Sequence, residues 1–312
     1  MRIQYLRSTL LLVILLAVTA SVPCVCLGAE QLRLVVRADE NEIAAGVPFI
    51  LRIALGANDG LPVEGVPEIS TLAGNVHVFI EDLRSGVRKR YLGPQWGTSE
   101  REPARVNITP DTPAVAEIPL LFSTVVDGRD DLCASPLPLV PGRYRITVEY
   151  LGVAPDSPVT GSIEVAVREP ADAAESAYWQ AMGTEPALAE SLQLGSFARS
   201  EELVDKADEL MREFPNNANS TMTALALGRH YLYVVRDPQK ARGYLEWASR
   251  RPGNALVVGR AKYELASAYI AQGLAEQAYA TIDEALKTVG TSGLSAELRR
   301  LRATHRPSAK RD

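Results

Sequence analysis

Side chains that could carry catalysis or hold a metal are few in this sequence and lie far apart. The three histidines are His77 in a predicted strand, His230 in a predicted helix and His305 near the C-terminus. The sequence has no H-E-x-x-H zinc motif, no G-x-S-x-G nucleophile motif, no G-x-x-x-x-G-K-[ST] phosphate loop and no pair of C-x-x-C motifs. We therefore predict a protein that is not an enzyme and that needs no cofactor or metal. An enzyme with a site at a seam between domains is an alternative.

Two loop segments could still bind a ligand. The segment DGRDD at 127–131 is acidic, but calcium loops alternate their oxygen ligands and Arg129 interrupts this one, which favours a solvated turn. Trp96, in GPQWG, could stack on a sugar or a partner, or it could plug the end of its domain. A carbohydrate-binding envelope protein that acts through Trp96 is therefore the alternative to the function proposed from the rest of the chain.

Residues 1–29 have the features of a secretory signal peptide. Arg2 and Arg7 precede the uncharged stretch TLLLVILLAV, which is too short to span a bilayer comfortably, and the small residues Gly28 and Ala29 follow. We predict cleavage near Ala29 and export to the periplasm or the extracellular space. An uncleaved N-terminal anchor is the alternative.

Cysteine usage indicates a fold without disulfides. Cys24 and Cys26 lie inside the predicted signal, and they follow Pro23 and Val25 rather than the small residue that precedes a lipid-accepting cysteine. Only Cys133 then remains in the exported chain, so no internal disulfide can form and packing alone must hold the fold. We expect Cys133 to be buried.

The charge balance argues against a nucleic-acid partner. The chain has 33 basic and 38 acidic residues, and removal of residues 1–29 takes away two arginines, which leaves a net charge of −7. Residues 291–312 reverse this sign with six basic side chains, Arg299, Arg300, Arg302, Arg306, Lys310 and Arg311. Membrane association is therefore expected only through an uncleaved signal or through this basic tail.

Residues 30–169 alternate between apolar and polar positions with the period of β-strands. Short β-branched runs are separated by turn residues, and they read LRLVVRA, PFILRIAL, NVHVFIED, VRKRYLG, AVAEIPLLF, GRYRITVEY and GSIEVAVRE. Seven such runs predict an antiparallel β-sandwich of the immunoglobulin-like kind, without the Cys–Trp–Cys set of antibody domains. The segments at 93–113 and 125–142 are interpreted as long end loops.

Two stretches carry the resemblance to immunoglobulin-like domains of bacterial surface proteins. EIAAGVPFILRIAL resembles their first corner, where a glycine turn precedes the second strand. VPGRYRITVEY resembles their penultimate strand, which begins at a Pro-Gly turn and points Tyr144 inward. The resemblance implies an architecture and no activity.

The period changes to 3.6 residues at Pro170. Asp172, followed by Glu175, predicts a capped helix start, and further starts are predicted at Ser200, Asp237 and Asn254. Because the junction is only a few residues long, the two domains are expected to dock against each other.

Alanine, tyrosine and glycine recur in the helical half at the spacing of a helical-hairpin repeat. From 259 to 290 the pattern is Leu265-Ala266, Tyr269, Gly273, Ala278, Ile282 and Ala285. The unit at 221–254 repeats it as Leu227-Gly228, Tyr231, Ala241, Leu245, Ala248 and Pro252, with a turn, YVVRDP, one residue too long. These spacings resemble tetratricopeptide repeats, with a degenerate unit at 187–219 and a capping helix and tail at 291–312. A generic helical bundle is the alternative for 170–290.

The tetratricopeptide resemblance implies a groove that binds a peptide or a partner protein. Carried over position by position, the groove-facing residues are Met222, Leu225, Arg229, Leu232, Arg260, Tyr263, Glu264 and Ser267. Arg229 and Arg260 are expected to be exposed and to matter little for folding, unlike Ala278 at a helix contact. The alternative is that the groove is covered by the sandwich. The sequence indicates neither the identity of the partner nor the oligomeric state.

Overall fold

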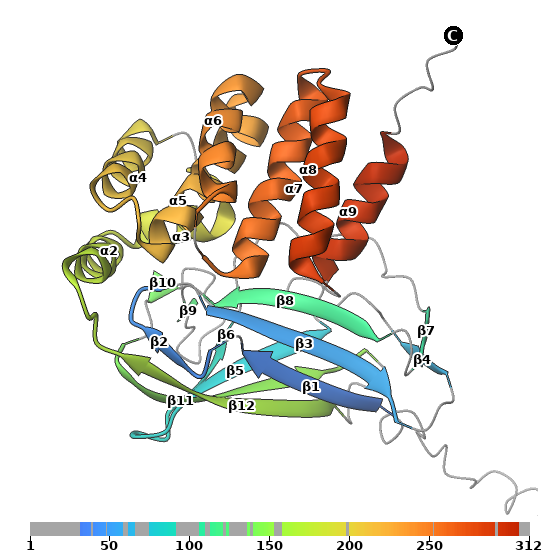
Figure 1. Cartoon of the computed structure of the whole chain (residues 1–312). Helices are drawn as coiled ribbons and strands as arrows, with labels where there is room; N and C mark the ends of the chain where they lie inside the picture. Colours follow the sequence, from blue (N-terminus) through green and yellow to red (C-terminus); the bar gives the residue numbers. More distant parts are fainter. Residues whose placement is uncertain are drawn as a thin grey trace, which may run out of the picture.

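The computed structural model joins a β-rich half to a helical half, as the sequence predicts at this coarse level (Figure 1). It describes residues 32–38, 40–47, 49–58, 62–65, 75–91, 106–109, 113–120, 123–124, 136–137, 140–152, 158–197, 200–251, 253–290 and 293–305. Predictions for the signal peptide, Trp96, Cys133, the acidic segment 127–131 and the tail beyond His305 fall outside these residues.

The β-rich half contains two principal sheets. One has the order β1(Leu32–Ala38), β3(Phe49–Ala57), β8(Ala114–Leu120). The other has the order β2(Glu42–Ala44), β12(Val159–Arg168), β11(Gly142–Tyr150), β5(Val76–Asp82), β6(Arg88–Tyr91). Two short pairs, β4(Val63–Gly65) with β7(Val106–Ile108) and β9(Ser123–Thr124) with β10(Pro136–Leu137), complete the described strands.

A single apolar core lies between the two principal sheets. Alternation along β11 buries four side chains, Tyr144, Ile146, Val148 and Tyr150, while the residues between them are less buried. The same alternation along β3 buries Leu51, Ile53 and Leu55, and all seven belong to one cluster. Period-two patterning therefore identified the inward residues of both sheets.

All seven predicted strands form, but the sheets contain more than was predicted. The additional strands β2, β4, β7, β9 and β10 have two or three residues each, too few to show a period. β7 lies in 93–113 and β10 in 125–142, both of which were interpreted as loops. The sheet is also not purely antiparallel, because β2 pairs with β12 in parallel.

The helical half runs from Asp172 to the end of the described chain. Its helices are α2(Ala173–Thr184), α3(Pro186–Leu194), α4(Glu201–Glu213), α5(Ala218–Arg229), α6(Pro238–Ser249), α7(Ala255–Ala271), α8(Ala275–Val289) and α9(Gly293–Thr304). The four predicted N-caps are confirmed, since the side chains of Asp172, Ser200, Asp237 and Asn254 each accept a bond from a first-turn N–H.

The recurring small residues lie where neighbouring helices touch. Ala266, Ala278 and Ala285 are 0–1% exposed in the cluster between α7, α8 and α9. In α5 a Cβ on Gly228 would lie 2.5 Å from the Leu245 side chain of α6, so only glycine fits there without repacking. Close helix approach is the physical reason for the repeated positions.

The extra residue of YVVRDP is accommodated by a π-helical segment, η1(His230–Val235), that continues α5. A π-helical turn takes one more residue than an α-helical turn, so the insertion widens the helix end instead of adding a loop. Arg236 then reverses the chain with φ of 63°, a left-handed conformation that is uncommon for a residue other than glycine.

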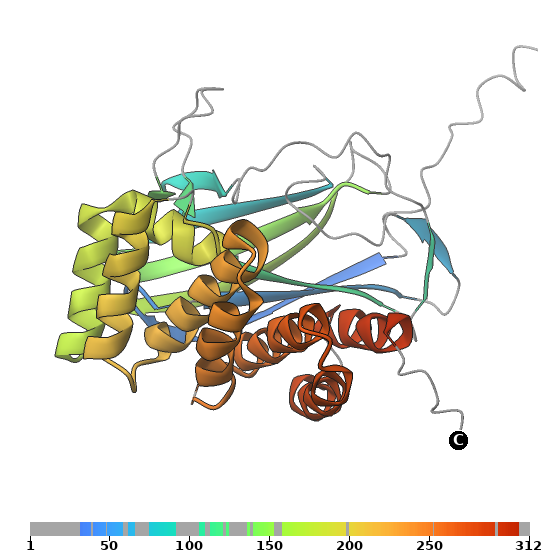
Figure 2. The ribbon, with the colours of Figure 1, turned by 90° about the horizontal axis from the view of Figure 1, so that it is seen from above.

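The helices stand on the outer face of the three-stranded sheet, and they follow one another in an arc across it (Figures 1 and 2). Contacts that join the halves include two hydrogen-bonded pairs and one apolar contact. The Gln193 amide of α3 donates to the Tyr91 hydroxyl of β6 at 2.7 Å, and Arg168 donates to both oxygens of Glu175 at 2.8 and 3.0 Å. Trp179 of α2 packs against the core of the strands. The two halves are thus in contact, as the short junction suggested.

Candidate functional site

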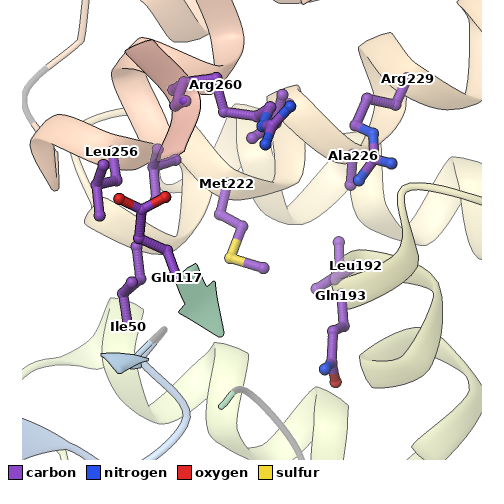
Figure 3. Close-up of a pocket in the computed structure, with 12 residues that line it drawn as sticks. Ile50, Glu117, Leu192, Gln193, Met222, Ala226, Arg229, Leu256 and Arg260 are labelled. Atoms are coloured by element: carbon purple, nitrogen blue, oxygen red, sulfur yellow. The ribbon is translucent and has the colours of Figure 1, made fainter. Parts of the chain in front are cut away.

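A cavity of about 290 Å³ lies between the helices and the three-stranded sheet (Figure 3). Its walls come from α3, α5, α7, α9, β3 and β8, and they comprise Ile50, Glu117, Leu192, Gln193, Met222, Leu225, Ala226, Arg229, Leu256, Val257, Arg260 and Leu294. We call it the seam cavity. Most of its lining is apolar, with a small number of polar groups, which is the composition of a ligand-binding pocket.

Two arginines stand on the helix side of the seam cavity, while Ile50 and Glu117 enter it from the strands (Figure 3). Arg229 comes from the last turn of α5, and its Nε lies 3.4 Å from Glu264 Oε1 of α7. The Arg229 side chain is 35% exposed, whereas that of Glu264 is 4% exposed. This ion pair places the guanidinium beside the next hairpin, and its buried Nε has no hydrogen-bond partner among the described residues.

Arg260 is held by a partner of its own. Its two terminal nitrogens donate to the Glu297 carboxylate of α9 at 2.7 and 3.1 Å, and its guanidinium lies 5.2 Å from the centre of the Tyr263 ring. A two-point pair of this kind fixes the orientation of the arginine. Because its terminal nitrogens already have acceptors, Arg260 offers a ligand less than Arg229 does.

Glu264 is the most deeply buried carboxylate near the seam cavity. Burial raises its pKa, and the charge of Arg229 and a hydrogen bond from the Tyr233 hydroxyl oppose that rise without cancelling it. The side chain joins the two hairpins, since Arg229 and Tyr233 come from α5 and η1 and Glu264 from α7. Its role in the structure is to position Arg229.

The predicted groove residues divide into two sets. Four of them, Met222, Leu225, Arg229 and Arg260, line the seam cavity. The other four do not, and they are Leu232, Tyr263, Glu264 and Ser267. Leu232 is 9% exposed and belongs to the helical core, because the π-helical segment changes the helical register after Arg229.

The expectation that Arg229 and Arg260 are free exposed charges was wrong. Each side chain is about one-third exposed and each is paired, with Glu264 and Glu297. Removal of Arg229 alone would leave a buried carboxylate without its cation, and because Arg229 is 35% exposed the cost should be below the roughly 3–5 kcal/mol of a fully buried pair. The β-rich half covers part of the surface formed by the predicted groove positions, since Ile50 and Glu117 line the seam cavity opposite the helices.

Sequence reasoning missed the strand side of the cavity. Ile50 and Glu117 lie on the outer face of a two-faced sheet, and Glu117 stands opposite Arg52 in the register of β3 and β8. The sequence signal was present in β3, where Ile50 breaks the alternation as an extra apolar residue. An apolar side chain on an outward position indicates a covered face.

The described residues show no cluster for metal binding. Among them, no three His, Cys, Asp or Glu side chains gather in a group that could hold a metal ion. His77 lies on β5 beside the Phe79 ring, and His230 lies in the helical half, so the two do not share a site.

In the described part of the chain, no helix has the length and apolar character needed to cross a membrane.

Comparisons with known proteins identify no family. No protein-family model and no curated protein matches the chain. Solved structures of a beta-glucosidase from Listeria innocua, in complexes with isofagomine and with gluconolactone, align at 11% and 10% identity with a TM-score of 0.25. Each alignment covers 45% of this chain and 16% of that chain. Such a score does not establish a shared fold.

Proposed function

We propose that this protein is an exported, non-enzymatic interaction module that binds a peptide segment of a partner protein in the seam cavity. The supporting observation is an apolar cavity with an oriented arginine, Arg229, between a helical array and a sheet. An apolar side chain of the partner fills the cavity, and a carboxylate of the partner pairs with the guanidinium. The predicted signal peptide at residues 1–29 supports a location in the periplasm or outside the cell.

The β-rich half is proposed to be an immunoglobulin-like sandwich that acts as a rigid support. Its two sheet orders, β1-β3-β8 and β2-β12-β11-β5-β6, fit a sandwich in which the last two long strands lie at the centre of the larger sheet. The Tyr144 hydroxyl, near the start of β11, donates to the Val140 carbonyl at 2.7 Å, as in the tyrosine corner of that fold.

The helical half is proposed to be a short tetratricopeptide-like array. Two consecutive hairpins, α5–α6 and α7–α8, bury their small residues at equivalent contacts, with Gly228 against α6 and Ala266 in the cluster with α8. In such an array the first helix of each hairpin lines the binding face. Here those helices are α5 and α7, which supply seven of the residues around the seam cavity, namely Met222, Leu225, Ala226, Arg229, Leu256, Val257 and Arg260.

A peptide library selected on the immobilised full-length exported chain tests the proposal. We expect the selected peptides to share an acidic residue or free C-terminus next to an apolar side chain. Replacing Arg229 and Glu264 together by glutamine removes the cation without leaving an unpaired carboxylate, and it should weaken the peptides tenfold or more, about 1.4 kcal/mol.

Two matched variants complete the test. Ala226→Phe adds bulk to the α5 wall of the cavity at a position that is 1% exposed, so its melting temperature is measured first, and under conditions where it is folded it should lose binding. Arg250→Gln removes an arginine whose side chain is 75% exposed on α6, and it should change nothing. Selected peptides that bind the Arg229/Glu264 double variant with unchanged affinity would overturn the proposal. Polysaccharide binding lost in Trp96→Ala would favour the carbohydrate alternative instead.

A further inference from the structure

A second cavity, of about 480 Å³, lies on another side of the helical half, between the start of α4 and the segment η1. Its lining comes from α4, η1 and α6 and comprises Ser200, Glu201, Val204, Asp205, His230, Tyr231, Val234, Val235 and Lys240. We call it the η1 cavity. It shares no lining residue with the seam cavity, and its volume is typical of a small-ligand pocket.

His230 lines the η1 cavity and has one ring nitrogen that can donate a hydrogen bond. The residue is 3% exposed, and its Nδ1 accepts a hydrogen bond from the Phe197 N–H at 3.3 Å. A ring nitrogen that accepts carries no proton, so the proton of the neutral ring is on Nε2. Burial, assisted by the charge of Lys240, lowers the pKa of His230 and keeps the ring neutral at pH 7. In the described structure no acceptor is bonded to this Nε2–H.

Lys240 and the start of α4 provide further groups that can bind an anion. The Lys240 ammonium lies 4.1 Å above the Tyr231 ring, and within the described residues it forms no ion pair. At the N-terminus of α4, the Ser200 side chain accepts from the Leu203 N–H, which leaves the N–H of Glu201 without an acceptor inside the helix. The charge of Lys240 acts on the His230 ring, so these two side chains are near enough to hold one carboxylate between them.

Helix α4 also provides negative charge to the η1 cavity. Glu201 and Asp205 are one turn apart on α4, both side chains line the η1 cavity, and both residues are exposed. Lys240 alone does not balance two carboxylates, so a purely anionic ligand would be repelled. A ligand with a carboxylate and an ammonium satisfies both sides, and Val204 and Val235 offer an apolar contact between them.

We propose that the η1 cavity binds a short zwitterionic peptide of dipeptide size, with its carboxylate at His230 and Lys240 and its ammonium at Glu201 and Asp205. The one-residue insertion in the first hairpin creates the site, because η1 carries His230 to the cavity along with Val234 and Val235. The site is independent of the proposed peptide binding in the seam cavity.

Titration of the full-length exported protein with L-alanyl-L-valine, followed by calorimetry and by the histidine NMR signals, tests the inference. We expect saturable binding that shifts the His230 signals and leaves those of His77 unchanged. The N-acetylated and the C-amidated dipeptides, which each lack one charge, should bind at least tenfold more weakly. Equal affinity for the amidated dipeptide, or saturation without a His230 shift, would overturn the proposal, as would the absence of saturable binding.

Two variants test the two ends of the ligand separately. Lys240→Gln should weaken binding of the dipeptide at least fivefold and leave the affinity of the C-amidated form unchanged. Asp205→Asn should also weaken binding of the dipeptide at least fivefold, but it should leave the affinity of the N-acetylated form unchanged. Lys287→Gln, at an exposed position of α8, is the control and should bind as the wild type does. If Lys240→Gln and Asp205→Asn both bind with wild-type affinity while melting normally, the assignment is wrong.

Discussion

The two helical hairpins, α5–α6 and α7–α8, pack their helices through equivalent small residues, but they differ in the turn that joins the two helices. In the second hairpin, α7 ends at Ala271, the chain reverses at Gly273, whose φ of 73° suits glycine, and α8 begins two residues later. In the first hairpin, α5 continues into η1 and the reversal falls on Arg236, with φ of 63°. Each helix pair buries its small residues, and the first hairpin in addition forms the η1 cavity.

The difference shows how one inserted residue is tolerated and used. The contacts between α5 and α6 are preserved, since Leu245 and Ala248 remain fully buried. The insertion is absorbed at the helix end, where Tyr233 and Val235 become about half exposed and the Tyr233 hydroxyl reaches Glu264 of the next hairpin. The insertion therefore leaves the contact between α5 and α6 intact and alters only the surface at the end of α5.

The largest expected effect tests whether the two hairpins are equivalent. Ala241→Leu in α6 and Ala278→Leu in α8 each insert a large side chain at a position that is 0–1% exposed. Overpacking costs roughly 1–3 kcal/mol, occasionally more, so both variants should melt well below the wild type. Thermal denaturation followed by circular dichroism measures this. Ala280→Leu, at an exposed position of α8, is the control, and a loss confined to one hairpin would contradict equivalence.

The next effect concerns the paired positions Gly228 and Ala266. Gly228→Ala places a methyl group 2.5 Å from Leu245 and should destabilise by about 1–3 kcal/mol, despite the higher helix propensity of alanine. Ala266→Gly removes a buried methyl group and should cost at least about 1 kcal/mol. Urea titrations measure both. Increased stability in Gly228→Ala would show that α5 and α6 are less close than described.

Two carboxylates should respond to pH in opposite directions. The folded-state pKa of Glu264 is raised by burial, so its ionisation costs stability as pH rises above about 4.3, the ordinary glutamate pKa. The melting temperature of Glu264→Gln relative to wild type should therefore increase from pH 4 to pH 7.

Glu175, at the junction of the two halves, provides the opposite case. Its hydrogen bonds from Arg168 lower its pKa, so its stabilisation is present above the ordinary value and is lost as pH falls through the lowered one. Glu175→Gln should melt below wild type at pH 7, and this difference should shrink towards pH 3. Parallel pH trends in the two variants would contradict the assigned environments.

The smallest effect tests the two reversals. Arg236→Gly relieves a left-handed conformation and should stabilise by up to about 1 kcal/mol, whereas Gly273→Ala imposes one and should cost about 1 kcal/mol. No atom lies within 4 Å of a Cβ at Gly273, so backbone strain alone is measured there. Differential scanning calorimetry resolves shifts of this size. If Gly273→Ala has the same stability as the wild type, the two turns do not differ in backbone strain.

Local patterns predicted the elements, and their limits are physical. Seven strands and four helix N-caps were identified because alternation and capping are encoded within a few neighbouring residues. The strands of two or three residues were missed, since a period cannot be read from so few positions. The seam cavity was half predicted, through Met222, Leu225, Arg229 and Arg260, because the helix positions follow a repeat.

The sequence by itself determined the order of a β-rich half and a helical half, the inward faces of the strands and the small residues at the helix contacts. These properties depend on periodicity and on residue size, which are local. The tertiary structure alone decided that Ile50 and Glu117 close the seam cavity, that Glu264 pairs with Arg229, and that an inserted residue becomes η1. Each of these three features depends on groups that are distant in the chain. They come together only because the helices pack against one another and against the sheet.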